Sequence, residues 1–148
     1  MERAEPHNTN GRAESPSLRI SIPPNARYGK SVRDEVMAFA HRHNIAICDL
    51  EDFIFALGEA IANAIEHSGS PDAIEIICRI EKDKIVATVT DSGRGFRTDP
   101  LPKTPLPDEL AERGRGLPIM ERCSDIFAVR SVPGKGTAVV LGRYLRMR

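Results

Sequence analysis

The segment that decides the fold is LGEAIANAIEHSG, from Leu57 to Gly69, which predicts the second half of an amphipathic helix. Apolar side chains recur three and four residues apart between Leu50 and Ile65, so they share one face at about 100° per residue. Glu59 and Asn63 lie one turn apart on the opposite face, bordered by alanine and glycine. A solvated helix face carries long charged side chains more often, so these small borders indicate that something packs closely over the polar stripe.

Two glycine-rich segments follow this helix. DSGRG, at 91–95, comes directly after a predicted strand, and GRG, at 114–116, precedes a short predicted helix. The Asp91 carboxylate can accept a hydrogen bond from an exocyclic amine, as in adenine. Glycines allow the backbone to approach a flat ring, and free amides at a helix start suit phosphates. The three segments together predict a nucleotide pocket.

The rest of the chain predicts a strand, two helices, a hairpin, a long loop, a helix and a second hairpin. Asp49 is the expected N-cap of the central helix, and Asn25 or Ser31 that of the helix before it. The expected strands and helices are strand 18–22, a helix ending near 43, helix 49–67, strands 73–81 and 84–90, helix 117–124, and strands 126–132 and 137–144. This order fits an α+β domain with helices on one face of a mixed, mostly antiparallel sheet.

The two remaining parts of the chain are predicted to be irregular. Residues 1–17 are polar, so we expect a flexible tail ahead of a single domain at 18–148. The segment 97–114 contains four prolines, which disfavour a helix and predict a stiffened loop that acts as a lid.

Composition narrows the classes of partner. The chain of 148 residues balances 21 Lys and Arg against 21 Asp and Glu, which gives no electrostatic case for binding nucleic acid or an anionic membrane. No apolar run approaches the roughly 20 residues needed to span a bilayer, and the first residues lack a signal peptide's apolar core. Three cysteines without metal-ligand spacing are typical of reduced thiols, which predicts a cytoplasmic protein.

Asn63 and Glu59 suit the chemistry of phosphate transfer. The Asn63 amide oxygen is a hard ligand of the kind that Mg²⁺ accepts, and Mg²⁺ keeps most of its waters. Glu59 is placed to accept a proton from an attacking hydroxyl or water.

These residues resemble the GHKL ATP-binding family, and within it the bacterial anti-sigma-factor serine/threonine kinases. The stretches that carry the resemblance are LGEAIANAIEHSG (57–69), DSGRGF (91–96), LPDELAERGRGLPIMERCSD (106–125) and GKGTAVVL (134–141). The resemblance implies the Bergerat fold, a two-layer α/β sandwich, over about residues 18–145.

The resemblance also implies roles for individual residues. Glu59 is the general base, Asn63 is the Mg²⁺ ligand and Asp91 binds the adenine amine. The implied ATP-binding set is Asn63, Asp91, Gly93, Gly95, Gly114, Arg115, Gly116, Leu117, Gly136 and Thr137. The implied protein substrate is an anti-sigma-factor antagonist of the STAS type, a sigma factor is a second partner, and a homodimer is expected.

Two other functions would use the same nucleotide pocket. A nucleotide-gated protein that sequesters a partner without phosphorylating it would need the same pocket. The catalytic module of a histidine kinase would need a helical dimerisation segment before the ATP domain, and about 17 polar residues are too few for one.

Overall fold

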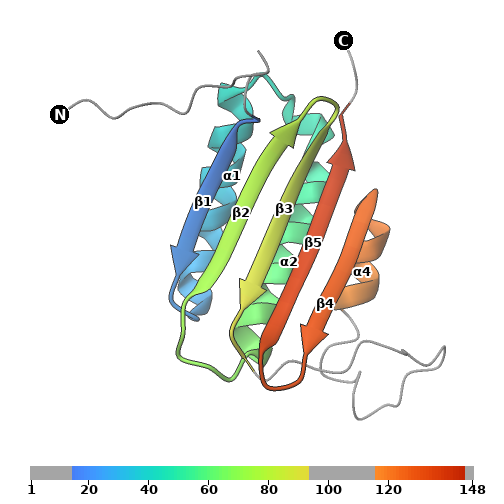
Figure 1. Cartoon of the computed structure of the whole chain (residues 1–148). Helices are drawn as coiled ribbons and strands as arrows, with labels where there is room; N and C mark the ends of the chain where they lie inside the picture. The colour runs from blue at the N-terminus through green and yellow to red at the C-terminus, as the bar shows by residue number, and fades with distance from the viewer. Residues whose placement is uncertain (1–14, 94–115, 146–148) are drawn as a thin grey trace, which may run out of the picture.

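The computed structural model describes residues 15–93 and 116–145, and these form one sheet and a layer of helices (Figure 1). The elements are β1 (Ser17–Ile22), the 3₁₀ helix η1 (Ala26–Tyr28), α1 (Gly29–Arg42), the 3₁₀ helix η2 (Ile47–Asp49), α2 (Glu51–His67), β2 (Ile74–Glu81), β3 (Lys84–Asp91), α4 (Gly116–Arg122), β4 (Ile126–Val132) and β5 (Gly136–Tyr144). The strand order is β1-β2-β3-β5-β4, and every pairing described is antiparallel. The predicted α+β class is therefore confirmed.

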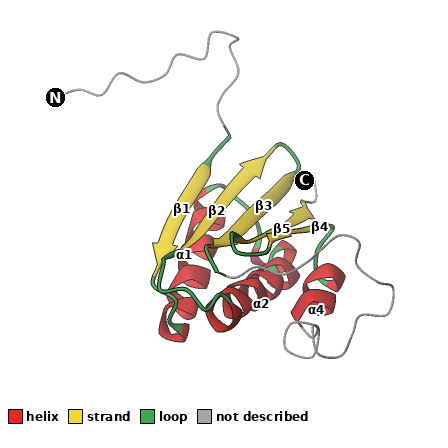
Figure 2. Cartoon of the chain, turned by 60° about the horizontal axis from the view of Figure 1, so that its bottom comes forward, coloured by secondary structure: helices red, strands yellow, loops and turns green. Residues whose placement is uncertain are grey.

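The helices α1, α2 and α4 all cover the same face of the sheet (Figure 2). α2 lies in the middle of this layer, between α1 and α4. Its apolar face is fully buried at Phe53, Leu57 and Ile61. Burying a side chain of this size stabilises the fold by about 1.5–3 kcal/mol, so the α2 stripe is a main contributor to the core.

The starts of α1 and α2 differ from the predicted caps. Asp49 ends η2, and α2 begins after Leu50 with no side-chain cap hydrogen bond, so the prediction of Asp49 as its N-cap was wrong. Asn25 caps η1 and not α1, because its side chain accepts a hydrogen bond from the Arg27 backbone N–H at 3.0 Å. In each case a short 3₁₀ turn takes up the residues that the sequence pattern assigned to the helix entry.

α2 is tied to the sheet at its first turn. Glu51 and Asp52 place negative charge at the positive end of the helix dipole. The Asp52 carboxylate also lies 3.5 Å from the Arg143 guanidinium on β5. These contacts fix the start of α2 against one end of β5, and the rest of the helix then runs along the sheet toward the other end (Figure 1).

The predicted tail falls mostly, and the predicted lid at 97–114 wholly, outside the described residues. Within the part of the chain that is described, no helix combines the length and apolar character needed to cross a membrane.

Candidate functional site

The face of the sheet that packs against the helices is apolar along most of β3, β5 and β4. At one end of these strands, the last row of side chains on this face is polar. Strand register places Val139 of β5 opposite Val89 of β3 and Val129 of β4, all facing the helices. Two residues further toward the sheet end, Thr137 lies opposite both Asp91 and Ser131. We call Asp91, Thr137 and Ser131 the polar row.

All three side chains of the polar row are buried. Burying polar groups costs free energy unless they are hydrogen-bonded. The hydroxyls of Ser131 and Thr137 share a hydrogen bond at 2.7 Å, and the Asp91 carboxylate accepts one from the Gly93 backbone N–H at 2.8 Å. The row is thus a fixed, polar end to an otherwise apolar face, which is the setting in which a small polar ligand is recognised.

Glycine at two positions brings the surrounding backbones together. A Cβ built at Gly93 would lie 2.6 Å from the Ser68 carbonyl carbon at the end of α2. A Cβ at Gly136 would lie 3.0 Å from the Asp91 carbonyl carbon, and Gly136 also has a φ of +111°. The turn after β3 therefore packs on the end of α2 and on the start of β5 only because both residues lack a side chain.

The predicted site residues on α2 lie toward this end of the sheet. Glu59 and Asn63 are both half-buried and lie about 6 Å apart along the helix axis. Asn63 precedes Ser68, the residue that Gly93 touches, by about 7.5 Å of helix rise. Figure 1 shows the last turns of α2, the end of β3 and the start of β5 at the same end of the molecule.

The described side chains fit a Mg²⁺ ion that is bound mainly by nucleotide phosphates better than they fit an ion held by protein ligands alone. Among the described residues no group of three or more His, Cys, Asp or Glu side chains is placed to hold a metal ion. Asn63 supplies a single amide oxygen, and Mg²⁺ usually takes one or two protein ligands together with waters and substrate phosphates. The residues therefore fit an ion that arrives with its nucleotide.

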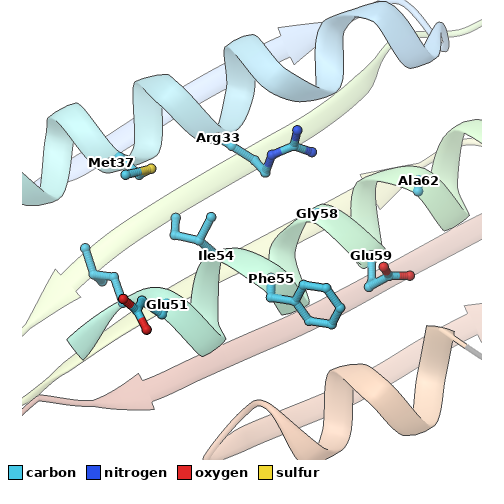
Figure 3. A pocket seen from close by; sticks show the side chains of 9 residues that line it. Arg33, Met37, Glu51, Ile54, Phe55, Gly58, Glu59 and Ala62 are labelled. Atoms are coloured by element: carbon cyan, nitrogen blue, oxygen red, sulfur yellow. The ribbon is translucent and has the colours of Figure 1, made fainter. Parts of the chain in front are cut away.

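A groove of about 580 Å³ runs between α1 and α2 (Figure 3). We call it the α1–α2 groove. It is lined by Arg33, Met37, Leu50, Glu51, Ile54, Phe55, Gly58, Glu59 and Ala62. Glu59 is the lining residue that also belongs to the predicted catalytic pair, so the groove opens next to the candidate base.

Some predicted site residues are placed here and others are not. Gly116 and Leu117 begin α4, whereas Gly95, Gly114 and Arg115 lie outside the described residues, as does the Leu117 side chain. The sequence reasoning missed Ser131 and the groove. Ser131 could have been found, because alternation along β4 puts it on the inner face after Phe127 and Val129.

Comparisons with known proteins bear on the family and the fold. The sequence profile of the histidine kinase-like ATPase domain matches residues 22–143. An anti-sigma F factor of Thermoanaerobacter sp. strain X514 is 36% identical over 121 residues, which cover 76% of this chain and 82% of that protein. A serine-protein kinase RsbW of Bacillus velezensis is 29% identical over 138 residues, with 86% and 85% covered.

Two solved structures show the same fold. The RsbU and RsbW domains of a Mycobacterium tuberculosis protein match with a TM-score of 0.68 at 20% identity, over 92% of this chain and 34% of that one. This chain thus spans about a third of that solved chain. A histidine kinase domain from Erythrobacter litoralis matches with a TM-score of 0.53 at 20% identity, over 84% of this chain and 62% of that one.

Proposed function

This chain belongs to the histidine kinase-like ATPase domain family, and on that premise we propose that it is an ATP-dependent serine/threonine protein kinase that also acts as an anti-sigma factor. The relatives named anti-sigma F factor and serine-protein kinase RsbW support both halves of the proposal. The observation that carries it in this chain is the buried polar row at the end of the sheet where α2, the helix that bears Glu59 and Asn63, also ends (Figure 1).

The polar row would bind the adenine end of ATP. Asp91 would accept a hydrogen bond from the adenine amine, and its own bond from the Gly93 N–H holds the carboxylate in place. Thr137, held by Ser131, would bind beside it. Gly93 and Gly136 keep the surrounding backbones close. Gly95, Gly114, Arg115, Gly116 and Leu117 remain the predicted phosphate and adenine contacts.

The α2 pair would serve the reacting phosphate. Glu59 would accept the proton of the serine or threonine hydroxyl as that oxygen bonds to the γ-phosphorus of ATP, while the bond from the γ-phosphorus to the β–γ bridging oxygen breaks and ADP leaves. Asn63 would hold Mg²⁺, which supplies charge neutralisation on the phosphates when bound. The helix fixes the two side chains about 6 Å apart along its axis, so base and metal ligand are set by one rigid element.

The partners that we propose are a STAS-type anti-sigma-factor antagonist as the phosphorylated protein and a sigma factor as the sequestered one. The names of the relatives support the sigma-factor link. The cytoplasmic location and the homodimer expected from the sequence stay predictions.

The test is transfer of phosphate from γ-³²P-ATP and Mg²⁺ to purified STAS-domain proteins of the source genome. The proposal predicts labelling of one serine or threonine in one such protein, located by mass spectrometry. Measurable ATP binding without labelling of any of them would contradict the kinase activity and favour the sequestering protein.

A further inference from the structure

We propose that Ser131 is a positioning residue that selects the nucleobase. Its hydroxyl donates to Thr137, and this directs the Thr137 proton toward a ring nitrogen that lies beside the amine bound by Asp91. This inference rests on the proposed ATP-binding function of the polar row and adds a determinant of its specificity. The ligand edge that fits is the edge of adenine that carries N1 and the exocyclic amine.

The Ser131 hydroxyl contacts two oxygen atoms at different distances. Its Oγ atom lies 2.7 Å from the Thr137 hydroxyl oxygen and 3.4 Å from the Gly136 carbonyl oxygen. Hydrogen bonds between a hydroxyl and an oxygen are usually about 2.5–3.0 Å long. A hydroxyl carries one proton. The shorter of these two contacts therefore takes the Ser131 proton, and Thr137 accepts it.

This direction decides what Thr137 presents to a ligand. A hydroxyl whose oxygen accepts one hydrogen bond still has its own proton to donate. The Thr137 proton then points away from Ser131. Thr137 lies between its two register partners, Ser131 on β4 and Asp91 on β3. Side chains of such partners on one face have Cβ atoms about 4.5–5.5 Å apart, so Thr137 and Asp91 can contact neighbouring atoms of one ring.

The polar row thus offers one acceptor and one donor side by side. The ionised Asp91 carboxylate only accepts, and the Gly93 N–H holds it at 2.8 Å. Adenine presents an amine donor beside the N1 acceptor, so both of its groups match. Guanine presents a carbonyl oxygen beside an N1–H donor, so both of its groups are mismatched. A mismatch leaves buried polar groups unpaired, which is the strongest source of discrimination between such ligands.

Burial gives the direction of this proton its weight. Ser131 is 6% exposed and Thr137 is 7% exposed, so bulk water has little access to either hydroxyl. The neighbouring row on the same face is formed by valines of β3, β5 and β4. In such a setting of low dielectric constant, hydrogen bonds are stronger and consecutive bonds polarise one another. The Ser131 hydroxyl therefore acts on the ligand through Thr137.

The experiment measures, by calorimetry with Mg²⁺, how tightly the full chain binds ATP and two analogues. In 1-deaza-ATP a C–H group replaces N1, and purine riboside triphosphate lacks the exocyclic amine. The variant is Ser131→Ala. Its matched control is Ser21→Ala, the same change at an exposed position on β1, the strand at the opposite edge of the sheet.

The wild type should bind 1-deaza-ATP about 5- to 150-fold more weakly than ATP, because the Thr137 donor is left buried without an acceptor. Ser131→Ala should bind ATP about 2- to 12-fold more weakly than the wild type. Its own loss for 1-deaza-ATP should shrink to about twofold, because the Thr137 hydroxyl can then rotate. The loss for the analogue without the amine depends on Asp91 and should be the same in both proteins. Ser21→Ala should behave as the wild type.

Three results would overturn the inference. An equal loss for 1-deaza-ATP in the wild type and in Ser131→Ala would show that Ser131 does not direct the Thr137 proton. Wild-type binding of 1-deaza-ATP as tight as that of ATP would show that the row donates nothing to N1. Losses for both analogues that shrink together in Ser131→Ala would indicate a loosened pocket. Absence of ATP binding by the wild type would overturn the proposed function itself, which distinguishes the two failures.

Discussion

Replacing Gly93 by alanine should lower both the stability of the fold and its affinity for ATP. It therefore tests whether the turn after β3 belongs to the ATP-binding site. The new Cβ would overlap the Ser68 carbonyl oxygen and Cα and would stand 2.6 Å from the Ser68 carbonyl carbon, whereas ordinary contact begins at 3.4 Å, so the two backbones must move apart by more than about 0.8 Å. The Ser68 atoms that it meets belong to the backbone, which has no rotamer to adjust. Overpacking of this kind typically costs about 1–3 kcal/mol in the free energy of unfolding.

The same displacement should weaken ATP binding. Moving Gly93 away from Ser68 strains its 2.8 Å hydrogen bond to the Asp91 carboxylate. A hydrogen bond to a charged group is worth about 1.5–3 kcal/mol, so we expect the dissociation constant for ATP to rise roughly 10- to 150-fold. Calorimetric titration with Mg²⁺-ATP measures this change, and urea denaturation measures stability.

Gly134→Ala is the matched control for this experiment. Gly134 has a φ of +79° but open space around its Cβ position, so alanine adds backbone strain of about 1 kcal/mol without a clash. The control should lose stability and keep its ATP affinity. Wild-type ATP affinity in Gly93→Ala, or an equal loss of affinity in Gly134→Ala, would refute the reasoning.

Three further predictions concern the polar row and the core. Ser131→Ala removes the 2.7 Å bond to Thr137 and should weaken ATP binding by about 0.5–1.5 kcal/mol in a titration; unchanged affinity would contradict its positioning role. Burial raises the pKa of the Cys78 thiol to about 12 from 9.0. The stability from keeping it protonated is therefore present below pH 9.0 and is lost as pH rises toward 12, and urea denaturation of Cys78→Ala should lack that part of the alkaline loss. A wild-type pH profile in the variant would disprove this origin. Phe53→Ala empties a fully buried site and should cost about 3–5 kcal/mol of unfolding free energy by urea denaturation, and a loss below 1 kcal/mol would be inconsistent with its place in the core.

The helices and strands could be predicted from the sequence because apolar residues recur at regular spacing along them. In β2, Ile74, Ile76 and Cys78 alternate with exposed or half-buried residues, and all three are fully buried. The apolar face of α2 was equally clear, as Phe53 and Leu57 show. Such periodic burial depends on local spacing alone, which a single sequence contains.

The details that the sequence could not supply depend on contacts between distant segments. The bond between Ser131 and Thr137 is closer in sequence, but it depends on the register of the β4–β5 hairpin, which the turn sets and which side-chain alternation along one strand does not give. The α1–α2 groove depends on how Arg33 packs across Gly58 from another helix. Phe55 lies off the apolar stripe of α2, and the approach of α1 is what makes this exposed side chain part of a groove.

The most direct test of the central claim compares Glu59→Gln with Asp91→Asn in the same two assays, ATP binding and phosphate transfer to the STAS-domain protein. The account predicts that Glu59→Gln keeps ATP affinity within about threefold and loses transfer by at least about a hundredfold, since only the proton acceptor is removed. Asp91→Asn should lose both binding and transfer. Full transfer by Glu59→Gln, or ATP affinity that falls in step with its transfer rate, would contradict the assignment of Glu59 as the base and of the polar row as the nucleotide site.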